Sequence, residues 1–390
     1  MTHEHLVRVA LFLLLSSMSI YNAKSANAIN NTKIAPSFNF DVEQPISMLS
    51  NSCIHTIIFS KNRASQLHLL FRTMDIYYPE WNQQPSTVVV AATTTELKNG
   101  YRLLQRMYKG KQFYWQEDDN NRESLKASLM KVLTSRNCEL IHLQCDDYVF
   151  VNKITNERII DNFLKYGSSL QNVVFSVHPK LRRGIYNVEW EAPKTFQKEL
   201  YWKPEMEKHE WNFQGEMSSS IWRRLDILHI VQQSTFPSVN WFEQALHYYS
   251  VAYKELVQPK ESNFRRLSTG FQLPITVHVD VNVAKTEATN DIVNIDRKKK
   301  YEQKFSLNNL NLKFLNGERL NIDVSKCNIS VTLCNGSEAL YYEEFSRVEK
   351  QVLNALLVKT NRIKGDALIE TYIQNVFSAN YDGDNINEAN

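Results

Sequence analysis

Glycine is scarce in this 390-residue sequence, which has only 10 such residues, and neither G-x-G-x-x-G nor the G-x-x-x-x-G-K-[ST] loop occurs in it. Both patterns need glycine where the backbone closely approaches a phosphate. Their absence argues against a dinucleotide-binding Rossmann protein and against a P-loop protein. Cysteine and histidine also show no spacing typical of a zinc site.

An excess of one charge is missing too. Lys and Arg total 45 against 42 for Asp and Glu, a formal net charge of +3. So mild a balance gives no reason to expect nucleic acid as a partner, and the short basic run 297–300 is predicted to be a solvated helix face. After the first 28 residues no apolar run is long enough to cross a bilayer, so membrane contact is expected only through the N-terminus.

The N-terminus has the layout of a signal peptide. Arg8 precedes an apolar stretch that ends near Ile20, and Ala26 and Ala28 occupy the −3 and −1 positions of a cleavage site after Ala28. Residues 1–28 are therefore predicted to be a signal peptide, with an uncleaved membrane anchor as the alternative, and residues 29–50 a polar lead-in. Either interpretation places the protein in the lumen of the ER or Golgi, outside the cell or in a periplasm, where disulfides form.

Five cysteines are present, an odd number, so at least one thiol stays unpaired. Cys327 and Cys334 are near enough in sequence to close a small loop. Cys145 directly precedes two aspartates and is expected to be a buried free thiol.

Apolar periodicity alternates between strand and helix over the first part of the chain, which predicts βαβ units and a mainly parallel sheet flanked by helices. The predicted strands are 53–60, 86–92, 111–117 and 139–145, and the helices between them are 65–78, 95–108 and 122–133. Further on, the pattern predicts helices at 155–166, 225–233, 240–256 and 338–358 and strands at 172–179 and 275–283. It also predicts a helix, a glycine turn and a strand over 314–322. Residues 186–241 form an aromatic-rich region, and residues 381–390 are predicted to be a disordered tail.

The run "LIHLQCDDYVF", residues 140–150, ends a predicted buried strand in two adjacent aspartates, Asp146 and Asp147. Two like charges there are costly unless a cation compensates them. Mg²⁺ or Mn²⁺ would do so, with phosphate oxygens completing the coordination. The alternative is that one aspartate caps the next turn and the other is solvated. A second acidic cluster, 117–119, is predicted to be a loop and helix cap.

Polar residues also follow the first predicted strand, in "SKNR" from Ser60 to Arg63. Ligands of open α/β sheets sit outside the carboxyl ends of the strands, so this segment and the aspartates are expected to face one crevice. Ser60, Asn62, Arg63 and Asp146 are candidates for binding a phosphorylated donor, since helix N-termini favour anions and arginine can clamp a phosphate. A surface ion pair is the alternative for Arg63.

Residues 53–320 resemble the catalytic domain of a GT-A-fold glycosyltransferase, of the family 2-like kind. The segments that carry the resemblance are "IIFSKNR", "LIHLQCDDYVF" in the place of the DxD-type motif, "FQGEMSSSIWRR", "FPSVNWFEQALHYY" and "VHVDVNVAKTEATNDI". The resemblance implies a Rossmann-related α/β domain over 51–320. Its halves would be a nucleotide-sugar half at 51–150 and an acceptor half with an aromatic-rich subdomain at 151–320. A C-terminal helical extension at 321–380 would follow.

The resemblance further implies a UDP- or GDP-linked sugar donor and Mn²⁺ or Mg²⁺ bound at Asp146 or Asp147. This sequence has Asp-Asp-Tyr and not Asp-x-Asp, so which carboxylate holds the metal stays open.

Inverting transfer needs a carboxylate as general base. Glu243 is the first candidate for this base, and Glu216 and Asp226 are the others. The alternative role for Glu243 is a charge at a helix N-terminus that complements the helix dipole. A retaining mechanism would not need this base. Trp211 and Trp241 lie closest in sequence to the acidic candidates and could stack on an acceptor sugar, although core packing is the alternative.

The sequence thus predicts a hexosyltransferase-type glycosyltransferase that acts on a hydroxyl of a glycan, protein or lipid. A nucleotidyltransferase is a competing prediction, but its usual Gly-rich loop is missing. A secreted carbohydrate-binding or effector protein with a degenerate transferase fold is the alternative from another class. Arg182 and Arg183 are expected to be solvated, and His178 and His278 to be ordinary core or surface histidines.

Overall fold

The computed structural model describes residues 53–115, 122–177, 181–183, 189–256, 266–280, 306–328, 333–335 and 339–363. All of them belong to the larger of two compact units, Pro45–Asn390. The predicted signal peptide, lead-in, acidic cluster 117–119, His178, basic run 297–300 and tail lie outside these residues. Within them, no helix combines the length and apolarity that a membrane span requires.

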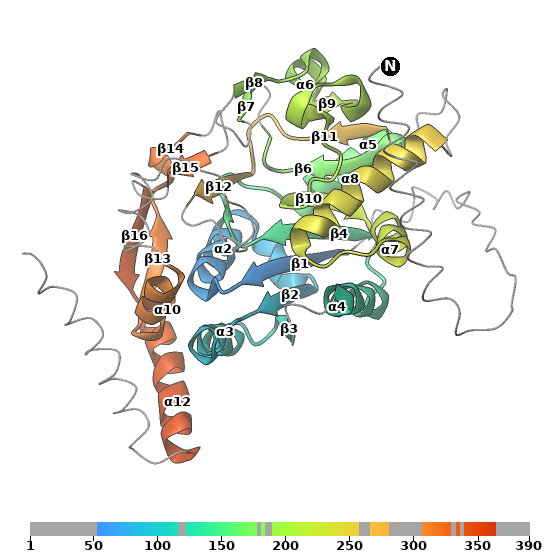
Figure 1. The fold of residues 1–390 in the computed structure, drawn as a ribbon. Helices are drawn as coiled ribbons and strands as arrows, with labels where there is room; N and C mark the ends of the chain where they lie inside the picture. Colours follow the sequence, from blue (N-terminus) through green and yellow to red (C-terminus); the bar gives the residue numbers. More distant parts are fainter. Residues whose placement is uncertain are drawn as a thin grey trace, which may run out of the picture. The chain divides into compact units, whose positions relative to one another are not determined.

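A mixed, mostly parallel sheet of eight strands forms the centre of this unit, in the order β3-β2-β1-β4-β10-β6-β11-β9 (Figure 1). Strand β10 runs antiparallel to β4 and β6, and β9 runs antiparallel to β11. The strands are β1 Ile54–Lys61, β2 Ser86–Ala91, β3 Gln112–Trp115, β4 Leu140–Cys145, β6 Leu170–Val174, β9 Tyr201–Trp202, β10 Ser219–Arg223 and β11 Leu267–Thr269. The predicted α/β class with a mainly parallel sheet is confirmed.

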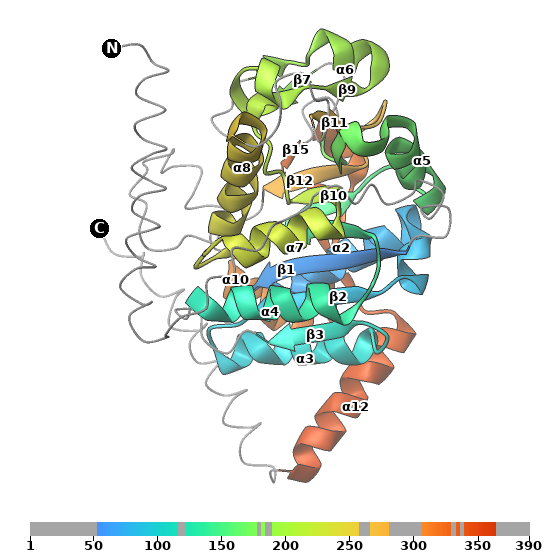
Figure 2. The ribbon, with the colours of Figure 1, turned by 90° about the vertical axis from the view of Figure 1, so that its right-hand side faces the viewer.

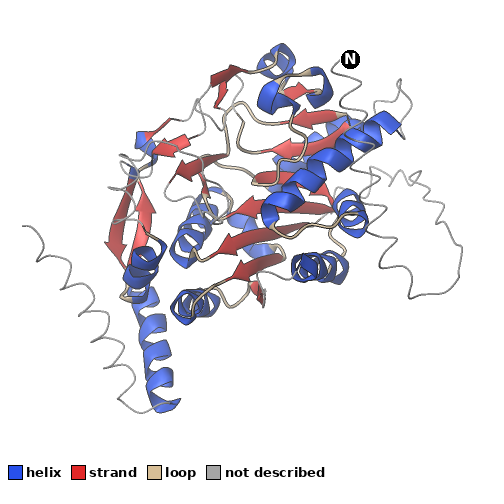
Figure 3. Cartoon of the chain, in the orientation of Figure 1, coloured by secondary structure: helices blue, strands red, loops and turns tan. Residues whose placement is uncertain are grey.

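Helices cover both faces of this sheet (Figures 2 and 3). One hydrophobic cluster joins β1 to α2, α3 and α5, and a second joins it to α4, α7 and α8. The helices are α2 Ala64–Tyr77, α3 Thr95–Met107, α4 Arg122–Ser135, α5 Asn156–Tyr166, α6 Lys194–Glu199, α7 Arg224–Gln233, α8 Val239–Leu256, α10 Leu307–Leu315 and α12 Arg347–Ile363. Every helix predicted up to residue 256 is present in this list.

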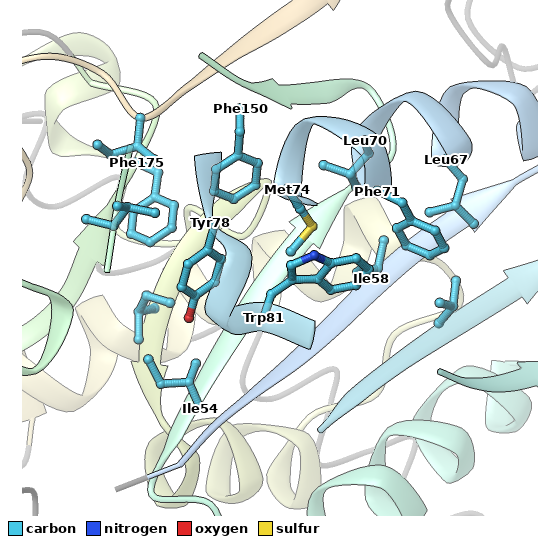
Figure 4. Packing of buried hydrophobic residues seen from close by; sticks show 14 of the residues in the cluster. Ile54, Ile58, Leu67, Leu70, Phe71, Met74, Tyr78, Trp81, Phe150 and Phe175 are labelled. Carbon is cyan, nitrogen blue, oxygen red and sulfur yellow. The ribbon is translucent and has the colours of Figure 1, made fainter. Parts of the chain in front are cut away.

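Strand β1 is buried on both sides, as a central parallel strand must be. Ile58 lies in the first cluster with Phe71 and Trp81, and Figure 4 shows this packing. Ile57 and Phe59 point into the second cluster. Full burial of such a side chain contributes about 1.5–3 kcal/mol, which explains why "CIHTIIFS" is recognisable as a strand.

A second, four-stranded sheet begins where β4 ends. Its order is β14-β15-β12-β5, and its strands are β5 Tyr148–Phe150, β12 Thr276–Asp280, β14 Cys327–Asn328 and β15 Leu333–Asn335. The chain therefore leaves the large sheet at Asp146 and Asp147 and enters the second sheet at Tyr148. Strand β12 pairs antiparallel with β5, with His278 opposite Tyr148, and the Val279 N–H donates to the Asp147 carbonyl over 2.8 Å.

The structure corrects the predicted helix over 338–358. Residues Leu340–Glu344 form strand β16, which pairs antiparallel with β13 Glu318–Ile322, and the helix starts only at Arg347. Cross-strand pairing with β13 overrides the local helical pattern, because strand propensity depends on such neighbours. The predicted helix, glycine turn and strand over 314–322 are confirmed by α10, Gly317 with φ of +87° and β13. A short hairpin pairs β7 Leu181–Arg183 with β8 Glu189–Glu191.

Two disulfides are present. Cys327–Cys334 closes the small loop that the sequence predicts, and Cys145 is free and half-buried. Cys53–Cys138, which the sequence did not predict, ties the start of β1 to the segment before β4.

Candidate functional site at the end of strand β4

The central strands bring the two polar segments together. β1 and β4 are parallel neighbours, and Phe59 lies opposite Cys145. The next residue on β1 is Ser60 and the next after β4 is Asp146, so both segments emerge at the same edge of the sheet. The two polar segments that the sequence predicts to face each other therefore lie side by side.

Arg63 compensates both aspartates. Its Nη1 lies 3.0 Å from Asp146 Oδ1 and 3.1 Å from Asp147 Oδ2. The side chains of Arg63 and Asp146 are only 8% and 4% exposed, whereas that of Asp147 is 27% exposed. Asp146 also accepts a 2.6 Å hydrogen bond from Ser60 through Oδ2. Asp146 is thus the inner carboxylate, with both oxygens engaged, and Asp147 is the outer one.

The surroundings move the pKa values of the two carboxyls in opposite directions. Burial raises the pKa of Asp146, and the neighbouring Asp147 charge adds to the rise, against the opposing effect of Arg63. Burial alone would also raise the pKa of Asp147, but its contact with His278 and the charge of Arg63 outweigh burial and lower it. The outer carboxyl group therefore loses its proton at lower pH than the inner one.

His278 reaches this site from β12, although the sequence predicts an ordinary histidine there. Its Nε2 lies 3.6 Å from Asp147 Oδ2, and its side chain is 36% exposed. The ring packs against Tyr148, with centroids 5.2 Å apart. Only the pairing of β12 with β5 makes this contact, and no local signal around residue 278 indicates it.

Tyr101 of α3 is a further residue that the sequence did not single out. Its hydroxyl accepts a 2.9 Å hydrogen bond from the Arg63 N–H and lies 2.7 Å from Ser60 Oγ. Because Ser60 donates its single proton to Asp146, Tyr101 must donate to Ser60. The phenol, fully buried, thereby connects the start of α2 to the inner carboxylate.

Asn62 has a structural partner. It adopts φ of +61°, a conformation that asparagine tolerates better than most residues. Its Oδ1 accepts a 2.9 Å hydrogen bond from the Thr93 N–H, and its own N–H donates to the Ala91 carbonyl. The side chain therefore joins the ends of β1 and β2, so its predicted role in donor binding has to compete with this contact.

Glu216 and Glu243 approach the aspartates around Cys145. Burial raises the pKa of the Cys145 thiol, and the charges of Asp147, Asp146, Glu243 and Glu216 raise it further. All four carboxylates are therefore near enough to the thiol to affect its pKa. Gly215 permits this arrangement, because a Cβ there would lie 2.3 Å from the Glu243 carbonyl oxygen on α8.

Two of the other candidates, Asp226 and Trp211, lie elsewhere, and Trp241 lies on the helix that carries Glu243. Asp226 lies in the first turn of α7, just beyond Arg223, which pairs with Leu140 at the opposite end of β4. Trp211 is 2% exposed and packs in the core against Phe196 and Trp202. Trp241 is 60% exposed on α8, the helix that carries Glu243.

A metal ion would find a partial ligand set at this edge. Among the described residues, no group of three or more His, Cys, Asp or Glu could hold a metal ion by itself. Asp147 contacts Arg63 and His278 through Oδ2, and neither contact uses Oδ1. The carboxylate suits Mn²⁺ or Mg²⁺ when phosphate oxygens supply further ligands, and the imidazole is a further ligand that suits Mn²⁺ better than Mg²⁺.

No protein-family model matches the sequence, and no curated protein matches it significantly. Among solved structures, the mannosyltransferase PcManGT from Pyrobaculum calidifontis, in complex with GDP-Man and Mn²⁺, matches at a TM-score of 0.34 and 10% identity. This match covers 57% of each chain, so the sequence spans less than two thirds of that enzyme.

Two more solved structures match at a similar level. TarS 1-349 of S. aureus in complex with UDP-GlcNAc gives a TM-score of 0.35 and 12% identity over 56% of both chains. Glucosyl-3-phosphoglycerate synthase from Mycobacterium tuberculosis, in complex with Mn²⁺, UDP-glucose and phosphoglyceric acid, gives a TM-score of 0.34 and 10% identity. This match covers 73% of this chain and 87% of that one. At such low identities and TM-scores, no activity is carried over from these proteins.

Proposed function

We propose that this protein is a metal-dependent glycosyltransferase that moves a hexose from a UDP- or GDP-linked donor to a hydroxyl of a glycan, protein or lipid. One observation carries the proposal: an arginine, two aspartates and a histidine meet at the carboxyl edge of β1 and β4, and two glutamates lie nearby around Cys145. This combination suits a diphosphate on one side and an acceptor proton on the other.

Asp147 and His278 are the residues that would hold Mn²⁺ or Mg²⁺. When bound, such an ion stabilises negative charge on a departing diphosphate. Asp146 keeps a different role, since both of its oxygens are engaged by Arg63 and Ser60. In this proposal it holds the guanidinium at the edge of the site, which supports Asp147 over Asp146 as the metal ligand.

Glu243 is the proposed general base of an inverting transfer. Glu216 is 5% exposed, and its Oε1 accepts a 3.1 Å hydrogen bond from the Ser218 N–H, so it is committed to the loop before β10. Glu243 is half-buried on α8 and close enough to Cys145 to affect the pKa of its thiol. Its carboxylate would take the proton of the attacking hydroxyl, with the exposed Trp241 on the same helix available to an acceptor sugar.

The disulfides Cys53–Cys138 and Cys327–Cys334 support a place in an oxidising compartment, in the secretory lumen, outside the cell or in a periplasm.

One observation favours a second candidate, a binding protein with a degenerate transferase fold. Arg63 already supplies the positive charge that the aspartates need, and the described residues contain no complete metal-ligand group. A protein of this kind would bind a nucleotide or a glycan without turnover.

Calorimetry with UDP and GDP, with and without Mn²⁺, tests the proposal. The variant Asp147→Asn should lose metal-dependent binding, while Asp161→Asn, an exposed aspartate on α5, should behave like wild type. Release of free sugar or transfer from UDP- and GDP-hexoses should then fall in Glu243→Gln without loss of nucleotide binding. Binding without any turnover would favour the second candidate. No binding of either nucleotide would contradict the glycosyltransferase proposal and leave the second candidate only as a glycan-binding protein.

A further inference from the structure

We propose that Arg63 makes metal binding conditional on the nucleotide: its guanidinium occupies the place of a cation between the aspartates, so a divalent ion binds firmly only together with a diphosphate. The inference rests on the proposed function, because it concerns the metal and donor of that same site. It adds a role for Arg63, that of an internal competitor of the ion.

The position of Arg63 is fixed at both ends of the residue. At its backbone, the N–H donates to Tyr101. At its side chain, one nitrogen, Nη1, contacts both Asp146 and Asp147. Because the side chain is 8% exposed, moving it away would leave a buried carboxylate without its countercharge. The guanidinium therefore stays in place when only a metal ion is offered.

The charges at the site then couple the binding of the metal ion to the binding of the nucleotide. A divalent ion at Asp147 and His278 would approach a carboxylate that Arg63 already compensates, and it would be repelled by the guanidinium at short range. A nucleoside diphosphate adds negative charge beside both cations. It removes this repulsion and brings oxygen ligands of its own. Metal and nucleotide should therefore bind with positive coupling, and the coupling must be reciprocal.

The test titrates Mn²⁺ into the whole protein in the absence and presence of UDP, with free Mn²⁺ followed by electron paramagnetic resonance. In wild type we expect UDP to tighten Mn²⁺ binding by about tenfold or more, and Mn²⁺ to tighten UDP binding by the same factor. Arg63→Gln should bind Mn²⁺ alone about tenfold more tightly than wild type, with a smaller effect of UDP. Arg63→Lys keeps the charge and should keep the coupling, and Arg102→Gln, an exposed arginine on α3, is the matched control.

Equal Mn²⁺ affinity of the wild type with and without UDP would overturn the inference, and this result does not depend on how any variant folds. So would an Arg63→Gln protein that is folded by circular dichroism yet binds Mn²⁺ alone no better than wild type. Neither result contradicts the proposed function if UDP still binds and sugar is still transferred. If Mn²⁺ fails to bind even with UDP, the metal-dependent function and the inference both fail.

Discussion

The Tyr101 hydroxyl accepts a 2.9 Å hydrogen bond from the backbone N–H of Arg63, so a residue of α3 holds the start of α2 beside the two aspartates. Tyr101→Phe leaves this N–H without its acceptor and removes the hydrogen bond that Ser60 accepts from Tyr101, while Ser60 still donates to Asp146. We expect it to lower the free energy of unfolding by about 1–3 kcal/mol, the usual cost of unsatisfied buried polar groups. Urea unfolding measures the change. The control Tyr248→Phe alters a tyrosine that is 53% exposed and should be close to neutral; a Tyr101→Phe protein as stable as this control would contradict the assigned contact.

Asp146 and Asp147 should differ in their contribution to stability. Asp146→Ala removes the inner carboxylate, which is 4% exposed, and should destabilise the protein by about 3–5 kcal/mol, because Arg63 loses a buried partner. Asp147→Ala removes a carboxylate that is 27% exposed and should cost about 1 kcal/mol or less. Chemical denaturation of both variants gives the ranking. The reverse order would mean that Asp147 is the structural carboxylate.

Gly100 interrupts a predicted helix, yet an alanine should not improve it. A Cβ at Gly100 would lie 2.2 Å from Asn311 Oδ1 and 2.9 Å from the Ala64 Cβ, where α3 meets α10 and α2. We expect Gly100→Ala to destabilise by about 1–3 kcal/mol through overpacking, against a gain in helix propensity of about 1 kcal/mol. Gly110 has no heavy atom within 4 Å of such a Cβ, so Gly110→Ala is the matched control and should shift the melting temperature little. A stabilising Gly100→Ala would refute the close approach.

Stability should fall in mild acid because histidines are buried in neutral form. Burial lowers the pKa of His142 from 6.5 to about 3, and that of His55 to about 4. At these two histidines the unfolded chain binds protons below pH 6.5 and the folded chain does not. Their contribution to stability therefore declines from about pH 6.5 toward pH 3 and is constant above about pH 7.

His142→Leu isolates one part of this dependence. Between pH 6 and pH 4 the slope of the free energy of unfolding against pH should decrease by up to about one proton relative to wild type. Urea unfolding at intervals of pH measures the slope, with pH 8 as the reference for any loss of packing. An unchanged slope would show that His142 titrates normally in the folded protein.

The two disulfides should contribute unequally. Cys53–Cys138 joins residues 85 apart in sequence, and Cys327–Cys334 joins residues 7 apart. By loop-closure entropy, replacing the first pair by serine should cost about 4–5 kcal/mol and the second about 2 kcal/mol. Thermal unfolding of the two double variants compares them, with Cys145→Ser as a control for serine at a half-buried position. Equal losses would indicate that constraint of the unfolded chain is not the main contribution.

Much of the fold could be predicted because its signals are local. The alternation of short β-branched runs with amphipathic helices predicted β1 to β4 and α2 to α4 to within a few residues. The proximity of the segment Ser60–Arg63 to the aspartates also followed, since parallel neighbouring strands end at the same edge of a sheet, although the buried ion pair of Arg63 with Asp146 was not predicted. Sequence proximity was a poor guide for Trp211, which lies near the acidic candidates along the chain but is buried in a core with Phe196 and Trp202. Asp226, a candidate base, lies toward the opposite end of β4.

The sequence by itself determined the class of fold, the parallel half of the sheet and the two acidic residues that end β4, because burial of apolar side chains imposes a periodicity that can be read along the chain. The tertiary structure alone decided that Tyr101 holds Arg63, that His278 faces Asp147 and that Leu340–Glu344 is a strand. These contacts join residues far apart in sequence, and they depend on helix packing and on the register of β5 with β12 and of β13 with β16. No local pattern encodes such a register, since it is selected by the combined packing of the partners it brings together.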